Sequence, residues 1–170
     1  MVLAGIGQVY EEASRLFRQQ QYAEALLVLQ QAGDSVPPEF VYARMRCLSK
    51  LHRIDEALAC CRSLDSTYDD PRVAMVSPRL LDSESTSEEE LLTAITRLCN
   101  YEEAVRLFWR GRYAEALAVL GEAGEQDHAE LVYARARCLS RLGRVEEALA
   151  CCELLDTTYH DPRGAVLAQK

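Results

Sequence analysis

The chain has 170 residues, of which 49% are hydrophobic and 27% charged, as in a folded globular protein. Its 27 acidic and 19 basic residues give a net charge of −8, which argues against general binding to nucleic-acid phosphates. No stretch approaches the roughly 18 consecutive apolar residues of a membrane span, and the first residues lack the pattern of a secretory signal. We therefore expect a cytoplasmic protein whose seven cysteines are reduced thiols.

Most of the sequence occurs twice. Shifting the chain by 91 positions aligns Tyr10–Ala74 with Tyr101–Ala165 without a gap, and 41 of the 65 aligned pairs are identical. A match at a fixed offset indicates repeated structural units. The two copies are therefore expected to share one fold.

The first copy predicts four helices, because apolar residues recur every three to four positions. These helices are expected at residues 9–19, 22–32, 39–51 and 54–64. Gly33 supplies the left-handed residue that ends the second helix, and Pro37 and Pro38 separate the two pairs. Each copy is therefore predicted to be two helical hairpins.

A short helix is expected after the second hairpin of each copy. Asp70 and Asp161 are suitable N-caps, and each precedes a proline at the first helical position, where its missing N–H costs nothing. The first short helix is expected near residues 71–76, and the second runs to Lys170.

One longer helix is expected to lead into the second copy. Ser87 and Glu90 have the spacing of a capping box, and the apolar spacing continues from there to Trp109. Beyond it, Gly111 and Gly143 occupy positions equivalent to Gln20 and His52, as in tight turns. The predicted parts are a first unit at residues 1–76, a polar linker at 77–87, and a helix with the second unit at 88–170.

The turn within each hairpin carries a shared motif. It reads Gly-Arg-Tyr-Ala-Glu-Ala-Leu at 111–117 and Leu-Gly-Arg-Val-Glu-Glu-Ala-Leu at 142–149, with weaker versions at 20–26 and 51–58. The motif resembles the turn of the tetratricopeptide repeat. Ala25 and Ala57 lie 32 residues apart, as do Ala116 and Ala148, close to that family's period of about 34. The resemblance implies an all-α solenoid of antiparallel helix hairpins, two tandem copies of a two-hairpin unit, that binds peptides or proteins and is not an enzyme.

The resemblance also implies a groove lined by the first helix of each pair. The positions that point there are Tyr42, Arg46 and Lys50 in the first copy, and Tyr133, Arg137 and Arg141 in the second. One aromatic and two cations on an acidic protein suit an acidic peptide or a C-terminal carboxylate. The alternative is a solvated helix face with a partly packed tyrosine.

Three aromatic residues are candidate anchors for a partner. Phe17 and Phe108 occupy equivalent positions in the outer hairpins, and Trp109, the only tryptophan, replaces Arg18. Packing against the helix between the copies is the alternative interpretation.

Adjacent cysteines occur at Cys60-Cys61 and Cys151-Cys152. Neighbouring helical residues point about 100° apart, so the two thiolates cannot readily chelate one ion. We expect structural thiols, with no metal and no cofactor, and no catalytic motif is found. The sequence thus predicts a protein-interaction adaptor, with a homodimer through equivalent faces as one arrangement. The alternatives are a tetratricopeptide chaperone of a bacterial secretion system and a thiol-based metal or redox protein.

Overall fold

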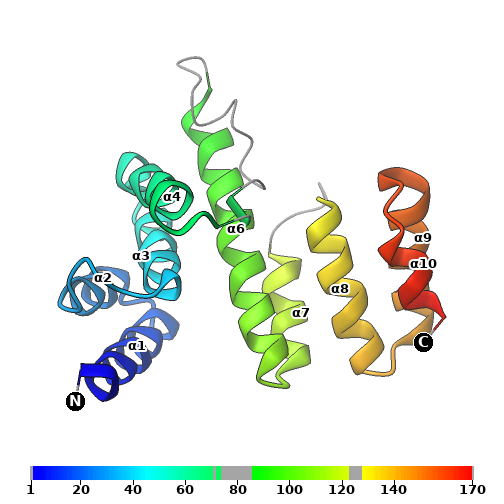
Figure 1. Cartoon of the computed structure of the whole chain (residues 1–170), viewed down its shortest axis with the longest axis horizontal. Helices are drawn as coiled ribbons and strands as arrows, with labels where there is room; N and C mark the ends of the chain where they lie inside the picture. The colour runs from blue at the N-terminus through cyan, green and yellow to red at the C-terminus, as the bar shows by residue number, and fades with distance from the viewer. Residues whose placement is uncertain (1, 71, 74–85, 123–127, 170) are drawn as a thin grey trace. The chain divides into compact units, whose positions relative to one another are not determined.

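The computed structural model describes residues 2–70, 72–73, 86–122 and 128–169 (Figure 1). Over these residues it contains helices and no β-strand, which confirms the predicted all-α class. The first copy forms α1 (Val2–Arg18), α2 (Tyr22–Gln30), α3 (Pro38–Lys50) and α4 (Ile54–Tyr68). It is followed by α6 (Glu88–Trp109), α7 (Tyr113–Gly121), α8 (Ala129–Arg141), α9 (Val145–Tyr159) and α10 (Arg163–Ala168).

The helix α6 begins at the predicted capping box. The backbone N–H of Glu90 donates to the Ser87 hydroxyl at 3.2 Å, and the Ser87 N–H donates to the Glu90 carboxylate at 3.1 Å. These bonds satisfy amide groups that have no partner within the helix. The prediction of one continuous helix as far as Trp109 is confirmed.

The chain divides into two compact units within α6, namely unit 1 (Met1–Cys99) and unit 2 (Asn100–Lys170). The sequence placed the division earlier, at residues 77–87, of which 77–85 lie outside the described residues. The boundary differs because Ala94, Ile95 and Leu98 of α6 are buried in the same cluster as residues of α3 and α4. The first half of α6 therefore completes unit 1.

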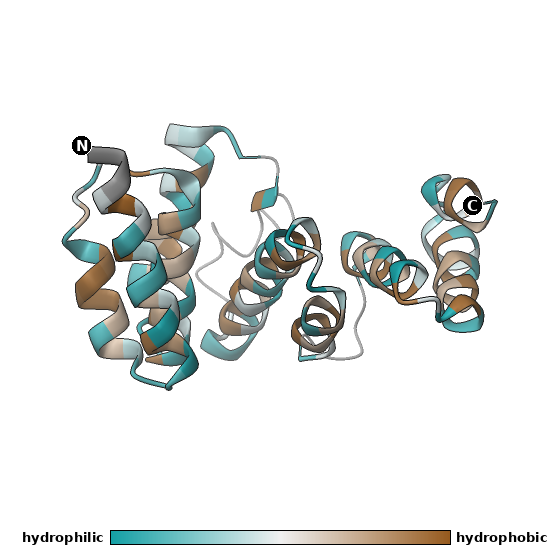
Figure 2. Ribbon diagram, turned by 90° about the horizontal axis from the view of Figure 1, so that it is seen from below, coloured by the Kyte–Doolittle hydropathy of each residue, from teal (hydrophilic) through white to brown (hydrophobic). Residues whose placement is uncertain are grey.

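Within each unit the helices pair as antiparallel hairpins. In unit 1, α1 packs on α2 and α3 packs on α4, while in unit 2, α8 packs on α9 and α10 packs on α9 (Figure 1). The helices carry both hydrophobic and hydrophilic residues (Figure 2), as expected for helices that bury one face. The seam alanines Ala25, Ala57, Ala116 and Ala148 are all buried, as predicted. Their small side chains let the paired helices approach closely.

The ends of two elements differ from the predictions. The first helix begins at Val2 instead of Val9, because Gly5 and Gly7, which have low helix propensity, concealed its first turns. The short helix expected near 71–76 lies mostly outside the described residues, which show only a 3₁₀ turn at Arg72 and Val73. Its counterpart α10 is present but begins at Arg163, with Pro162 as the N-cap residue instead of the predicted Asp161, whose carboxylate accepts a 3.0 Å bond from the Arg163 N–H.

Candidate functional site

An arginine lies over a phenylalanine ring at the same position in both units. The Arg46 guanidinium lies 4.4 Å from the centroid of Phe17, and that of Arg137 lies 4.3 Å from the centroid of Phe108. Cation–π contacts of this kind hold a guanidinium in place. The structure therefore brings together two sets of residues, the groove cations and the aromatic anchors, that the sequence had suggested as separate candidates.

In unit 1, Tyr42 is not available to a ligand. Its side chain is 0% exposed, its hydroxyl donates to the Asp70 carboxylate at 3.2 Å, and the Arg72 guanidinium lies 4.6 Å above its ring. Burial works to raise the pKa of Asp70, but hydrogen bonds from Arg72 and Tyr42 outweigh it and leave the pKa below its usual value. Tyr42 is thus a core residue, contrary to its predicted place in an open groove.

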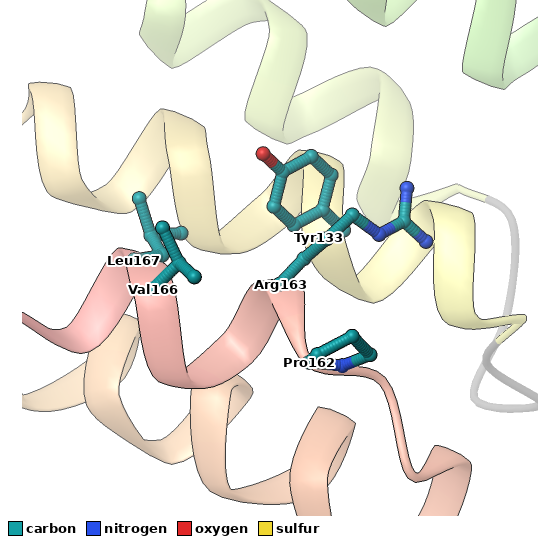
Figure 3. Close-up of a pocket in the computed structure, with 5 residues that line it drawn as sticks. All are labelled: Tyr133, Pro162, Arg163, Val166 and Leu167. Carbon is teal, nitrogen blue, oxygen red and sulfur yellow. The ribbon is translucent and has the colours of Figure 1, made fainter.

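In unit 2, the equivalent Tyr133 is only partly buried and borders two pockets. The first pocket has a volume of about 190 Å³ and is lined by Tyr133, Pro162, Arg163, Val166 and Leu167. Figure 3 shows Arg163 of α10 beside the ring of Tyr133 on α8, with Val166 and Leu167 further along α10. The Arg163 guanidinium lies 4.6 Å from the centroid of that ring. This pocket therefore has mainly apolar walls.

The charge of Arg163 is already compensated. Its guanidinium donates to Asp161 at 2.5 Å and to Glu130 at 2.9 Å. Hydrogen bonds with Asp161 and then Glu130 raise the pKa of Arg163 above its usual value, and the bond from Arg163 lowers the pKa of Asp161. Arg163 therefore shapes the pocket, while its donors are used within the protein.

The second pocket, of about 40 Å³, also borders Tyr133. It is lined by Tyr101, Ala104, Val105, Phe108, Tyr133, Ala134, Arg137 and Cys138. Arg137 lies 5.6 Å from the Trp109 ring and 5.8 Å from the Tyr133 ring, in addition to its contact with Phe108. Among the described residues, no carboxylate pairs with Arg137. This pocket therefore combines aromatic walls with an uncompensated cation.

Lys50, Arg141 and Trp109 line neither pocket. Lys50 and Arg141 are exposed at the last residues of α3 and α8. Trp109 is 73% exposed, and its ring meets the edge of Phe108 at a centroid distance of 5.8 Å. Phe17 and Phe108 pack on Tyr22 and Tyr113 of the next helix, so each anchors its own hairpin.

Two repeated roles of arginine were not predicted from the sequence. Arg163 follows an Asp-Pro pair that occurs in both copies, and this repetition is the signal that could have revealed it. Arg44 donates to the Leu29 carbonyl at 2.9 Å, and Arg135 donates to the Leu120 carbonyl at 3.0 Å. These bonds satisfy carbonyls at the ends of α2 and α7, so this second pair of arginines is structural.

The cysteines have the properties of core residues. Burial raises the pKa of Cys47 and Cys138 to about 11 and that of Cys61 to about 12, so these thiols stay protonated at neutral pH. Within the part of the chain that the structure describes, no three His, Cys, Asp or Glu residues gather as metal ligands would.

Two comparisons with known proteins found a similarity. Residues 107–170 match the model of the tetratricopeptide repeat. A crystal structure of a thermophilic TPR protein from Thermus thermophilus is similar at 20% identity and a TM-score of 0.41, over 96% of this chain and 97% of that one. No curated protein matches the chain. Among the described residues, no helix combines the length and apolar character needed to cross a membrane.

Proposed function

We propose that this chain, of which residues 107–170 match the tetratricopeptide repeat and are largely repeated in the first half, is a protein-interaction scaffold that holds an acidic peptide segment on unit 2. The binding surface is the groove of unit 2, which we define as the two pockets that border Tyr133. The observation that carries the proposal is the cation of Arg137, which has no carboxylate partner among the described residues.

The surroundings of Arg137 favour a carboxylate as its partner. The contact with Phe108 fixes the guanidinium over a ring face and leaves N–H donors at its edge. A carboxylate can accept two parallel hydrogen bonds from such a fork, and bonds between charged groups are about twice as strong as neutral ones. An Asp or Glu side chain, or a C-terminal carboxylate, therefore fits this position.

The other pocket suits an apolar side chain of the same peptide. Val166, Leu167 and the ring of Tyr133 provide apolar walls, and Arg163 is occupied by its own acidic neighbours. An extended peptide can thus place a carboxylate at Arg137 and an aliphatic side chain beside Leu167. The preferred ligand combines an acidic residue with a nearby Leu, Ile or Val.

The two units are not equivalent in this respect. Tyr42 is buried and bonded to Asp70, whereas Tyr133 borders both pockets. The groove of unit 2 is therefore the peptide site, although Arg46 and Arg137 lie in matching aromatic contacts.

The test is a selection from a random peptide library, followed by affinity measurements on the chain and on Arg137→Met. Methionine keeps apolar contact with Phe108 but removes the charge. We expect the selected peptides to be enriched in Asp and Glu, and Arg137→Met to weaken their binding at least about tenfold, because a lost charged hydrogen bond costs about 1.5–3 kcal/mol.

The matched control is Arg112→Met, which removes an exposed arginine paired with Glu115 and absent from the pocket lining. It should leave the peptide affinity unchanged, because Arg112 lines neither pocket. It should also change the stability of the chain little, because exposed ion pairs contribute little. Peptides without acidic residues, or equal binding by Arg137→Met and the unaltered chain, would reject the proposal.

A further inference from the structure

An apolar surface at one end of unit 2 is open to solvent. It consists of Leu142, Val145 and Leu149, which are 38%, 60% and 40% exposed and lie at the α8–α9 turn and in the first half of α9. We call these three residues the end face of unit 2. Contiguous patches of exposed apolar side chains are a feature of interaction sites.

The equivalent surface of unit 1 is covered. Leu58, which corresponds to Leu149, is 8% exposed, and Leu51 and Ile54 pack against the buried cluster. The sequence at these positions is almost unchanged between the copies. The difference in exposure therefore comes from what lies on top of the surface.

The first half of α6 shares the buried cluster of unit 1 with this surface. Its residues Ala94, Ile95 and Leu98 are buried in the same cluster as Leu58. The Thr96 hydroxyl lies 3.2 Å from that of Ser49 on α3, and Ser49 is itself buried. In unit 2, Ser140 is the equivalent of Ser49 and Leu149 is the equivalent of Leu58. Both side chains are exposed there.

The short helix α10 covers a different part of α9. A Cβ atom at Gly164 would lie 2.7 Å from the Cys152 carbonyl oxygen and 3.0 Å from the Leu155 Cβ, so α10 rests closely on the second half of α9. The first half of α9, which carries Val145 and Leu149, stays open.

We infer that the end face of unit 2 is a docking site for an amphipathic α-helix of a partner protein, with the apolar pattern that α6 presents to unit 1. That pattern places Leu, Ala, Ile, Leu and Cys at i, i+3, i+4, i+7 and i+8, and a Thr at i+5. The same chain thus shows which helix this surface accepts. The docking site lies on α8 and α9 on the side of Val145. It shares no residue with the groove of unit 2.

The first test uses a fluorescein-labelled peptide with the sequence of residues 86–100, titrated with the full chain under reducing conditions. The surface of unit 1 is held by the covalently attached α6, whose effective concentration is of the order of millimolar, so the end face of unit 2 is the free site. We expect saturable binding that the double variant Val145→Glu, Leu149→Glu weakens at least about tenfold. Leu27→Glu, which alters an apolar residue that is 60% exposed in unit 1, should leave binding unchanged.

A second measurement attaches the helix to the chain, so that docking no longer carries the entropic cost of association between two molecules. Residues 86–100 are appended after Lys170 through a flexible Gly/Ser linker of about six residues, which keeps the spacing of the first copy. We expect this extension to raise the Tm by at least about 3 °C, and the double variant to cancel the increase. Arg137→Met should keep the full increase, which separates this inference from the groove.

Two results would overturn the inference. One is the absence of both peptide binding and thermal stabilisation, or effects of equal size in the double variant. The other is a dimer of the unaltered chain in sedimentation that dissociates in the double variant, because the end face would then belong to a second copy. A monomer that binds the peptide supports a partner's helix.

Discussion

At the residue scale, each of the four turns within the helix hairpins places one residue in the left-handed region. Gln20 and His52 have φ of 63° and 55°, and Gly111 and Gly143 have φ of 74° and 73°. In each turn the next residue's N–H bonds to the carbonyl five residues earlier, over 2.9–3.0 Å. This bond belongs to a common helix-ending motif in which glycine is favoured. At these four turns the first copy therefore tolerates backbone strain that the second copy avoids.

Replacing the strained residues with glycine should stabilise the chain. We expect Gln20→Gly and His52→Gly each to raise the free energy of unfolding by about 0.5–1 kcal/mol. Glycine adopts the left-handed conformation without the steric cost that other residues have there. Its larger loss of backbone entropy on folding offsets part of that gain. Urea unfolding monitored by circular dichroism measures the change. Gly111→Ala is the reciprocal variant and should destabilise by a similar amount. A decrease in stability for both glycine variants would contradict this account of the turns.

At the element scale, α10 depends on one close contact with α9. Gly164 is buried, and a side chain there would overlap the Cys152 carbonyl. The helix supplies Arg163, Val166 and Leu167 to the pocket beside Tyr133. The position of α10 therefore determines one wall of the proposed peptide groove.

The variant Gly164→Val tests this dependence. We expect α10 to detach, because the added side chain cannot be accommodated without a backbone shift that costs about 1–3 kcal/mol. Amide hydrogen exchange should show faster exchange in residues 163–168, and peptide affinity should fall. Ala165→Val changes an exposed neighbour and should leave both unchanged. Equal protection of α10 in Gly164→Val and the unaltered chain would show that the contact is unimportant.

Most of the elements could be predicted from local sequence. Alanine and leucine spacing predicted the hairpins, and the capping box at Ser87 predicted where α6 begins. The burial of Tyr42 could not be predicted, because it depends on Asp70 and Arg72 meeting its side chain from beyond α4. The role of Arg163 was missed for the same reason, since its partner Glu130 lies 33 positions away. Helical periodicity carries no information on contacts between residues that lie so far apart in the sequence.

At the scale of the whole molecule, duplication has produced two units with different free surfaces. The copies share 41 of 65 residues, yet the first is completed by half of α6, while the second leaves its end face and its groove open. Under the two proposals above, unit 2 is the part of this chain that binds partners.

The central claim is that Arg137 receives a carboxylate from a bound peptide. A crystal structure of the chain with a selected acidic peptide tests it most directly. The account predicts a peptide carboxylate about 2.7–2.9 Å from the Arg137 guanidinium and an aliphatic side chain beside Tyr133. A peptide bound elsewhere on the chain, with no acidic group at Arg137, would contradict it.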